Sequence, residues 1–570
     1  MKKLVLLSTL IVTMFTAQAR KFYVSNTGNN LNTTTQAQNQ ATPWATLSKV
    51  QSSLSTFIAG DSILFKRGDK FIGTLFIQNK SNLYFGEYGL GELPLFWGNG
   101  ASVSPLIYVV GCTNITFSSI KISDTTISTT DRTVPSKITV AFQLTSNTTG
   151  TVIKKCVMDR IGYGIYITTA SSGNTIDSCD IGNLRMIRNT PTSVNPDDDY
   201  GGVPIQISSS NNKFTNNYLH DCWSVSYDYG RDGGGVEFFE EGVAVENNII
   251  AYNTFYDCNG TFEHGSNSDG IANNPIRNNK IYYNKIINNN SVVYINNNGQ
   301  YRTKVSNLQF YNNVILQTLP NNNPVGSSGI MFSMATSDTS TGIIVLKNNI
   351  FQLSGGLPMT RAGQFTGTNL THTNNIYKLS NGSVTNFTLT STEIATQSSI
   401  WVSTINTNPL GWDYNLIDGS QAINTGTDVG LTNDISGNPL YLTPDMGILE
   451  KYTVVSLPCS FIYGQWSTCV NGSQTRSYTF APRGCVGVPN PDSLFRACSI
   501  NTIRRFYYDP TRIAIYIENS IPGRLLITNT IGSVVRNVTY RANGQWIGVR
   551  NFARGVCFAS TQGQSITFLR

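Results

Sequence analysis

The run Phe214-Thr-Asn-Asn-Tyr218 decides the fold, because close variants of it recur along the middle of the chain. The later variants are Ala251-Tyr-Asn-Thr-Phe255, Tyr282-Tyr-Asn-Lys-Ile286, Phe310-Tyr-Asn-Asn-Val314, Leu346-Lys-Asn-Asn-Ile350 and, less regularly, His372-Thr-Asn-Asn-Ile376. Aligning Asn216, Asn253, Asn284, Asn312, Asn348 and Asn374 gives spacings of 37, 31, 28, 36 and 26 residues. Repeats of this length predict a solenoid with one coil per repeat, in which stacked asparagine side chains hydrogen-bond along the axis.

The composition favours a mostly β protein. Charged residues make up only 13% of the 570 residues, whereas asparagine, serine, threonine and glycine abound, and these residues favour strands and turns over helices. The chain is too long for one ordinary domain, although a repeat architecture can extend over several hundred residues. The formal charge of +7 is too diffuse to predict a nucleic-acid partner.

Residues 1–19 have the features of a secretory signal peptide. Two lysines at the start are followed by an apolar run, Leu4 to Phe15, and by the small-x-small ending Ala17-Gln-Ala19. We therefore expect a secreted or cell-surface protein, whose formal charge falls from +7 to about +5 when the two lysines are removed. No later segment is long and apolar enough to predict a membrane span.

Two groups of motifs flank the repeats. Before them are Phe22-Tyr-Val-Ser-Asn-Thr-Gly-Asn29, Ala41-Thr-Pro-Trp-Ala-Thr-Leu47 and Gly60-Asp-Ser-Ile-Leu-Phe-Lys-Arg-Gly-Asp69. After them are Ser420-Gln-Ala-Ile-Asn424, Asp434-Ile-Ser-Gly-Asn-Pro439 and Pro444-Asp-Met-Gly-Ile-Leu-Glu450. Residues 20–452 thereby resemble secreted right-handed parallel β-helix proteins of the pectate-lyase-like kind. The resemblance implies that fold, with a short helix capping the first coil, but it does not specify an activity, since the superfamily includes lyases, hydrolases, epimerases and proteins with no known activity.

Three runs between the asparagine motifs place polar side chains at one equivalent position. They are Gly233-Gly-Gly-Val-Glu-Phe-Phe239, Thr261-Phe-Glu-His264 and Val292-Val-Tyr-Ile-Asn296, and their alignment puts Glu237, Glu263 and Tyr294 in one column. Because side chains alternate along a strand, these three are expected to point outward, together with Gln206 and Met331 in neighbouring coils. A slip of one residue would reverse every assignment.

The paired glutamates leave three interpretations open. Outward carboxylates one coil apart would lie about 5 Å from each other, a spacing that suits retaining glycoside hydrolysis and raises one of the two pKa values. Alternatively, the pair together with Asp232 or Asp228 could hold a Ca²⁺ ion that acidifies the carbon beside a uronate group, with Arg231 or Lys280 as the base. The third interpretation is a solvated or cation-bridged column without chemistry.

Nearby residues complete the candidate site. Asp199 lies in Asp197-Asp-Asp-Tyr200, which is either a solvated loop or a wall and source of metal ligands. The segment Tyr227-Asp-Tyr-Gly-Arg-Asp232 combines aromatic and charged groups, which stack on sugar rings and bind their hydroxyls. We assign catalysis to Glu237, Glu263 and Asp232, and substrate binding to Gln206, Tyr294, Tyr227, Tyr229, Arg231, His264 and Asp199. His264 has the same inward parity as Phe262, so a histidine in the core or at its rim is favoured over a catalytic one.

The ten cysteines show no metal-binding spacing, so structural zinc is not expected. Cys112, Cys156, Cys179, Cys222 and Cys258 are spread over the repeats. Cys156 and Cys179 share one local pattern, and Cys222 and Cys258 share another, which predicts that these four are buried, stacked core thiols, with a disulfide as the alternative.

Residues 457–500 change in character. Trp466-Ser-Thr-Cys469 followed by Gly472-Ser-Gln-Thr-Arg476 resembles a thrombospondin type-1 repeat, which implies that Arg476 stacks on Trp466 and that disulfides replace a core. Many such repeats have six cysteines, whereas this segment has four: Cys459, Cys469, Cys485 and Cys498. Three pairings of these four remain open.

Residues 503–570 contain short alternating strands and a basic end. Their order resembles the C-terminal sorting domains of the type IX secretion pathway, which implies a β-sandwich and a secretion-machinery partner. Asp509-Pro510 in place of Asn-Pro, and Cys557 in place of an aromatic residue, depart from the pattern. A plain β-sandwich without a sorting role is the alternative.

We therefore expect an all-β chain, with a parallel β-helix solenoid followed by a small disulfide module and a C-terminal β-sandwich. Its expected function is to bind a polysaccharide in a groove on the solenoid and to cleave it as a glycoside hydrolase or lyase, with Ca²⁺ as the one cofactor considered. The alternative is a non-catalytic cell-surface adhesin that only grips a glycan.

Overall fold

The computed structural model describes residues 19–168, 170–196, 198–267, 275–298, 302–318, 330–338, 340–353, 358–365, 368–379, 386, 388–440, 443–451, 459–468, 473–481, 489, 493–497, 505–509, 512, 514–518, 523–529, 534–540, 545–549, 556–561 and 564–569. The chain divides into two compact units, Met1–Tyr452 and Thr453–Arg570. The predicted signal peptide lies outside the described residues except for its last residue, Ala19. No helix among the described residues is long and apolar enough to cross a membrane.

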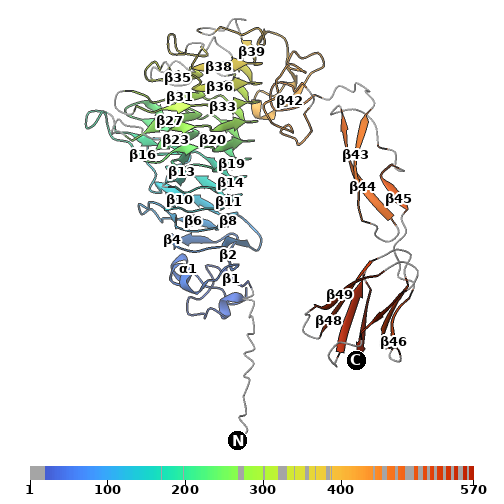
Figure 1. Ribbon diagram of the computed structural model, residues 1–570. Coiled ribbons are helices and arrows are strands. Elements are labelled where there is room, and N and C mark those ends of the chain that lie inside the picture. The colour runs from blue at the N-terminus through green and yellow to red at the C-terminus, as the bar shows by residue number, and fades with distance from the viewer. Residues whose placement is uncertain are drawn as a thin grey trace. The chain divides into compact units, whose positions relative to one another are not determined.

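The first unit is a right-handed parallel β-helix, as the sequence predicts. Nine coils contribute one short strand to each of three sheets, and neighbouring strands within these sheets are parallel, so the connections follow the usual right-handed course. Figure 1 shows the coils stacked in chain order, from the segment around α1 and β1 to β38 and β39. Inward-facing Phe, Ile, Leu and Val side chains form one continuous core along the axis.

The first sheet has twelve strands. They are β1 (Lys21–Val24), β2 (Ser62–Lys66), β5 (Tyr84–Tyr88), β8 (Thr116–Ser118), β11 (Val152–Lys154), β14 (Thr175–Asp177), β19 (Lys213–Thr215), β25 (Ile249–Ala251), β29 (Lys280–Tyr282), β33 (Leu308–Tyr311), β36 (Ile344–Lys347) and β38 (Leu370–Thr373).

The second sheet, which follows the first along each coil, also has twelve strands. They are β3 (Lys70–Ile72), β6 (Leu95–Trp97), β9 (Lys121–Ser123), β12 (Val157–Asp159), β15 (Asp180–Gly182), β20 (Tyr218–His220), β26 (Thr254–Tyr256), β30 (Lys285–Ile287), β34 (Val314–Gln317), β37 (Ile350–Leu353), β39 (Ile376–Leu379) and β40 (Ile394–Thr396).

The third sheet carries the predicted column and has nine strands. They are β4 (Leu75–Gln78), β7 (Ile107–Val110), β10 (Val140–Thr145), β13 (Tyr163–Ile167), β18 (Val203–Ile207), β23 (Val236–Glu240), β27 (Phe262–Ser266), β31 (Val293–Ile295) and β35 (Phe332–Met334).

Short elements decorate the coils. They are the antiparallel pairs β16 (Met186–Arg188) with β17 (Tyr200–Gly201), β21 (Ser224–Ser226) with β22 (Gly230–Asp232) and β41 (Trp401–Ser403) with β42 (Asp413–Leu416), the parallel strands β24 (Val245–Glu246), β28 (Ile276–Arg277) and β32 (Val305–Ser306), and the 3₁₀ turns η1 (Gln36–Gln38), η2 (Leu54–Thr56) and η3 (Pro409–Gly411).

The expected capping helix is present as α1 (Leu47–Ser52). Thr46 caps it, because its side chain accepts a hydrogen bond from the backbone N–H of Lys49. Trp44 is fully buried and stacks on Phe22 of the first strand, with ring centroids 5.6 Å apart. This segment therefore shields the apolar end that the first coil would otherwise expose.

The asparagine ladder is real, but the predicted alignment is wrong in four of six coils. The buried column consists of Asn217, Asn253, Asn284, Asn313, Asn349 and Asn375, with spacings of 36, 31, 29, 36 and 26 residues. Each of the five earlier amides donates from Nδ2 to the Oδ1 of the next asparagine at 2.9–3.1 Å. A second ladder joins Asn174, Asn212, Asn248 and Asn279.

The misalignment has a backbone cause. The residue before each ladder asparagine has a positive φ, and the six residues at this position are Asn216, Tyr252, Tyr283, Asn312, Asn348 and Asn374. Asparagine is the residue that best tolerates this left-handed conformation, so four coils carry an Asn-Asn pair and two carry Tyr-Asn. The predicted alignment used the first asparagine of each Asn-Asn pair, whereas the ladder contains the second, so the alignment was off by one residue in those four coils.

The five cysteines of the solenoid are free and buried, which confirms the prediction of core thiols for Cys156, Cys179, Cys222 and Cys258. Met331 is also buried, so its predicted outward orientation is wrong. Strand β35 begins at Phe332, the residue after Met331, and Ser333 is the residue that pairs with Tyr294 in the column.

The second unit consists of antiparallel strands. A three-stranded sheet comprises β43 (Ser460–Trp466), β44 (Ser473–Ala481) and β45 (Phe495–Ala497). Two further sheets comprise β46 (Arg505–Asp509), β47 (Ala514–Glu518) and β50 (Gln545–Gly548), and β48 (Gly523–Asn529), β49 (Val534–Tyr540), β51 (Val556–Thr561) and β52 (Gln564–Leu569).

In the small module, the guanidinium carbon of Arg476 lies 4.5 Å from the centroid of a Trp466 ring, as expected from the sequence. Arg496 approaches Trp466 at 4.4 Å. Cys459 is disulfide-bonded, whereas Cys469, Cys485 and Cys498 lie outside the described residues. The pairing scheme therefore stays a prediction.

Candidate active site

The predicted column is confirmed as a register of adjacent strands in the third sheet. Glu237 of β23 pairs with Glu263 of β27, and Glu263 pairs with Tyr294 of β31. Gln206 of β18 pairs with Glu237 on the other side. The residues before and after each member, among them Val236, Phe238 and Phe262, are buried in the core, so the column itself faces outward.

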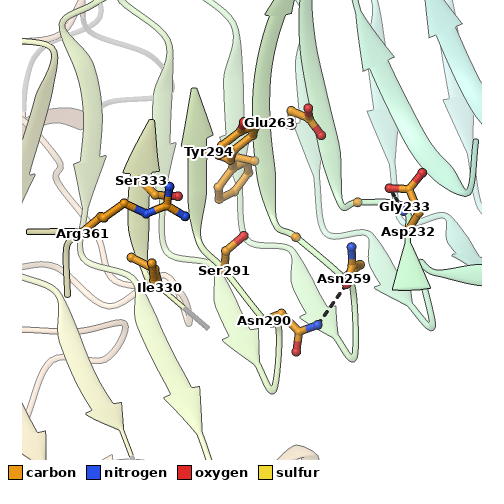
Figure 2. Close-up of a pocket in the computed structure, with 13 residues that line it drawn as sticks. Asp232, Gly233, Asn259, Glu263, Asn290, Ser291, Tyr294, Ile330, Ser333 and Arg361 are labelled. Atoms are coloured by element: carbon orange, nitrogen blue, oxygen red, sulfur yellow. Dashed lines mark hydrogen bonds between the residues drawn. The ribbon is translucent and has the colours of Figure 1, made fainter. Parts of the chain in front are cut away.

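Two adjoining cavities lie over this column. The acidic cavity, of about 670 Å³, is lined by Asp199, Asp228, Asp232, Glu237 and Glu263, with aromatic side chains that include Tyr163, Tyr200 and Tyr229. The arginine cavity, of about 210 Å³, is lined by Arg361, Ser333, Ser291 and Asn290. Both cavities share Asp232, Gly233, Asn259, Glu263 and Tyr294. Figure 2 shows the carboxyl groups of Asp232 and Glu263 beside the same open space, next to Tyr294.

Glycines make room for the site. Gly233 has a φ of +117°, and an added Cβ would lie 2.8 Å from the carbonyl oxygen of Gly202, so this turn into the third sheet requires glycine. Gly265 pairs with Phe239, and a Cβ on it would lie 2.8 Å from the Phe239 ring. Gly234 faces open space at the cavity. A larger residue at Gly234 would therefore reduce the space beside the carboxylates.

Two antiparallel hairpins form the acidic wall. Strands β16 and β17 carry the loop with Asp199, and β21 and β22 carry the loop with Asp228 and end at Asp232. Ser226 ties the loops together, because its hydroxyl donates to Asp199 Oδ2 at 2.7 Å and accepts from the backbone N–H groups of Asp228 and Tyr229. The loop of Asp199 is therefore folded against the site, as one of the two expectations had it.

The carboxyl groups of the site have raised pKa values. Burial, and after it the charge of Glu263, raises the pKa of Glu237 well above its ordinary value. Burial, and after it the charge of Asp232, raises the pKa of Glu263 to about 7. Burial also raises the pKa of Asp232 to about 6, with help from Asp199 and Asp228. The three side chains are only partly covered, since the cavity opens to solvent, but the surrounding protein limits their hydration.

Arg231 lines the acidic cavity, but the protein itself holds its charged end, which does not fit the predicted role in substrate binding. Its side chain is only 6% exposed, its Nη2 lies 2.5 Å from Asp257 Oδ1, and its guanidinium carbon lies 4.2 Å from the centroid of a Trp223 ring. Arg132 covers Trp223 as well, at 3.9 Å. The charged end of Arg231 is therefore already engaged and is not available to a substrate or as a base.

Four predicted residues line neither cavity. His264 is fully buried and stacks on Phe238 with ring centroids 4.9 Å apart, so its assignment to substrate binding is wrong; burial lowers its pKa to about 4. Lys280, proposed as an alternative base, belongs to the first sheet. Tyr227 is 55% exposed but does not line either cavity, and Gln206 is 5% exposed beneath the surface of the column.

Sequence reasoning missed Tyr163 and Arg361. Tyr163 has the same parity as Ile165 on β13, so strand alternation predicts an inward side chain, yet it lines the acidic cavity. Arg361 lies beyond β35, where no motif fixes the alignment. An isolated bridge between Phe332 and Thr360 places Arg361 next to Ser333 in the column, and this bridge has no sequence signal.

Three aspartates in the hairpins could hold a cation. Ligand atoms of Asp198, Asp199 and Asp228 lie within 4.8 Å of one another. Asp228 Oδ1 is buried without a hydrogen-bond partner, and an all-oxygen donor set suits Ca²⁺. Arg188 competes for this group, since its Nη2 lies 2.7 Å from Asp198 Oδ2. The residues therefore fit a calcium ion, although a cation would have to share Asp198 with an arginine.

Comparisons with known proteins identify no family for this chain. No family model matches the sequence, and no curated protein matches it. Among solved structures, pectate lyase Pel9A is 14% identical with a TM-score of 0.41, over 76% of this chain and 97% of that chain. The tailspike protein of E. coli bacteriophage HK620, in complex with a pentasaccharide, is 10% identical with a TM-score of 0.39, over 60% of this chain and 65% of that chain. Likenesses this weak carry no activity over to this chain.

Proposed function

We propose that the chain binds a polysaccharide along the outer face of the third sheet and hydrolyses it at Glu237 and Glu263. The observation that carries this proposal is the pairing of two glutamates on adjacent strands, at the base of an open cavity, with the pKa of both raised. Strand spacing of about 4.8 Å suits a retaining pair. Tyr200 and Tyr229, 46% and 41% exposed at the cavity, supply flat apolar faces for sugar rings.

The two roles are assigned from the charges that surround each carboxyl group. Glu237 is assigned as the proton donor, because burial and the charges of Glu263, Asp232 and Glu241 all raise its pKa, and it donates its proton to the glycosidic oxygen as the bond between that oxygen and the anomeric carbon breaks. Glu263, with a pKa of about 7, supplies the carboxylate that attacks the anomeric carbon and forms a glycosyl ester. Glu237, now ionised, removes a proton from the water that hydrolyses this ester. Asp232 acts on the pair through its charge.

A panel of neutral and acidic glycans tests the proposal, with new reducing ends and the absorbance of unsaturated uronides measured together. Hydrolysis predicts reducing ends without unsaturation. Both signals together would identify a lyase, and saturable binding without either would identify the adhesin. A lyase is the less favoured outcome, because Arg231 and Lys280 are unsuited to act as its base and the acidic cavity repels a uronate at the paired glutamates.

A calcium requirement is a second proposal, favoured by the cluster of Asp198, Asp199 and Asp228. Calcium held there would fix the two hairpins that form the acidic wall. Adding calcium to chelator-treated protein should raise the thermal melting temperature of the solenoid, and magnesium at the same concentration should have less effect, since it prefers a rigid octahedral site. An unchanged melting temperature would refute this second proposal and leave the first intact.

The second unit keeps its expected roles as proposals. We propose that residues 457–500 form an abbreviated thrombospondin type-1-like module, supported by the stacking of Arg476 and Arg496 on Trp466. We propose that residues 503–570 form a sorting domain for type IX secretion, supported by their antiparallel sheets. Deleting residues 503–570 in a host with this pathway should retain the protein inside the cell; unchanged secretion would leave a plain β-sandwich.

A further inference from the structure

Arg361 stands out because it extends the column of the third sheet beyond the glutamates. Thr360 bridges Phe332 of β35, so Arg361 follows Ser333, Tyr294 and Glu263 in successive coils. Three steps of about 4.8 Å place its backbone about 14 Å from that of Glu263. In Figure 2 its side chain extends over Ser333 toward Tyr294, and its charge lowers the pKa of Tyr294, although burial raises that pKa overall.

The guanidinium group of Arg361 has no protein partner among the described residues. It forms no ion pair or side-chain hydrogen bond with them and is exposed to the arginine cavity. Arg132 and Arg231 differ, because each binds an aspartate, Asp221 and Asp257 respectively, and each stacks on Trp223. Arg361 is thus the arginine whose donors face the cavity without being engaged by the described part of the chain.

Arg361 does not serve to neutralise the charge of the carboxyl groups in the acidic cavity. The raised pKa values of Glu237, Glu263 and Asp232 arise from burial and from neighbouring carboxylates, with no contribution from Arg361. The cation is therefore free to attract a group of the ligand.

The site consequently has two ends of opposite preference. At the acidic end, the carboxylates repel an anionic sugar and accept an uncharged one. At the other end, Arg361 offers a planar pair of donors that matches a carboxylate or sulfate, and Ser291, Asn290 and Ser333 offer neutral hydrogen-bonding groups around it. A uniformly charged polymer would suit only one end.

Building on the proposed function, we infer that Arg361 recognises an anionic sugar of an acidic heteropolysaccharide. The carboxylate- or sulfate-bearing sugar lies at Arg361 while an uncharged sugar lies at Glu237 and Glu263, a few units along the same chain. Arg361 determines specificity and takes no part in bond cleavage.

The test compares polymers that differ only in charge. Wild-type protein and the variants Arg361→Gln, Arg361→Lys and Lys280→Gln are titrated calorimetrically with hyaluronan, chondroitin sulfate, xanthan and gellan, each beside its carboxyl-reduced form, and with chondroitin sulfate beside its desulfated form. Wild-type protein should bind at least one acidic polymer and should lose roughly tenfold or more in affinity when the charged group is removed. Arg361→Gln should erase that difference and Arg361→Lys should restore part of it. Lys280→Gln removes one exposed charge from the first sheet and should behave as wild type.

Loss on carboxyl reduction would identify a uronate, and loss on desulfation a sulfate; both support the inference. Where a polymer is cleaved, Arg361→Gln should raise KM with kcat nearly unchanged. A preference that survives in Arg361→Gln, equal binding of charged and uncharged forms, or failure to bind any acidic polymer would overturn the inference. The binding experiment requires no turnover, so unsaturated products or the absence of cleavage would refute hydrolysis without deciding the role of Arg361.

Discussion

Two columns of polar side chains run along the same solenoid and show opposite chemistry. The asparagine ladder from Asn217 to Asn375 is buried at the turn between the first and second sheets, and its amides bond to one another from coil to coil. The column of Glu237, Glu263 and Tyr294 lies on the outer face of the third sheet, at the base of a cavity. The spacing between members is the same strand spacing in both.

The difference lies in what each side chain can donate. An amide donates and accepts, so a stack of amides satisfies itself, and the ladder ends when Asn375 donates to the buried carboxylate of Glu393 at 2.9 Å. An ionised carboxylate only accepts, so two stacked carboxylates repel until one takes a proton or a ligand intervenes. The same geometry therefore stabilises the fold in one column and places two mutually repelling carboxyl groups side by side in the other.

The largest expected effect, a loss of catalytic rate, comes from replacing the glutamates of the acidic column with glutamines. Glu237→Gln and Glu263→Gln preserve shape but remove the proton donor and the nucleophile, so each should lower kcat by roughly 10²–10⁴-fold, the usual range for a positioned acid or base. Reducing-end assays on the polymer found in the glycan panel measure this loss. Glu92→Gln, at an exposed position outside both cavities, is the matched control. Wild-type rates in both cavity variants, with unchanged circular dichroism, would remove the proposed site.

The next effect concerns the ladder itself. Asn284→Ala leaves the backbone N–H and Nδ2 of Asn253 without their acceptor and removes donors from Ile250, Tyr282 and Asn313. Each buried group left unpaired costs about 1–3 kcal/mol, so we expect a loss of about 2–4 kcal/mol in the free energy of unfolding. Urea denaturation of the solenoid measures it. The exposed Asn26→Ala should change it by less than about 0.5 kcal/mol. Equal losses in both variants would mean that the ladder adds no special stability.

Much of the fold follows from the sequence. The repeated asparagine predicts a solenoid, and the resemblance carried by the flanking motifs, which include Trp44, implies that the solenoid is a capped parallel β-helix. The exact register of Asn216 or Asn217 does not follow, because the left-handed residue before the ladder accepts either asparagine or tyrosine. The sequence pattern shows where two asparagines are adjacent, but only the backbone conformation determines which of the two side chains points inward.

The column of the site was predictable because Val236 and Phe238 fix the parity of Glu237, and Phe262 fixes that of Glu263. Its surroundings were not. The sequence predicts that Arg231 binds substrate, but in the structure Trp223 and Asp257 engage its guanidinium. Neither contact belongs to the sequence motif that contains Arg231. Arg361 enters through a loop of variable length, whose register depends on one bridge to β35. Sequence periodicity places strands, but contacts between loops decide which charges remain free.

A smaller effect should appear in the pH dependence of stability. Carboxyls with raised pKa values bind more protons in the folded than in the unfolded protein, so they lower stability as pH rises from about 4.5 toward 7. The wild-type melting temperature should therefore fall across this range more steeply than that of the double variant Glu237→Gln/Glu263→Gln. The asparagine ladder does not titrate and contributes nothing to the difference. Parallel melting curves at every pH would mean that the pair is ordinary in its ionisation.

The smallest expected effect comes from Asp232, which acts on the glutamates without pairing with either strand. Asp232→Asn removes one of the charges that raise the pKa of Glu263 and of Glu237, while burial, the larger cause, remains. Both pKa values should fall, so the bell-shaped profile of kcat/KM against pH should move toward acid with its maximum largely retained. A profile of unchanged position would show that the charge of Asp232 does not reach the pair, and complete loss of activity at every pH would make Asp232 a direct participant. An acid shift would show that a residue in a neighbouring hairpin sets the pKa values of the glutamate pair. The asparagine ladder cannot be adjusted in this way, because its amides do not titrate.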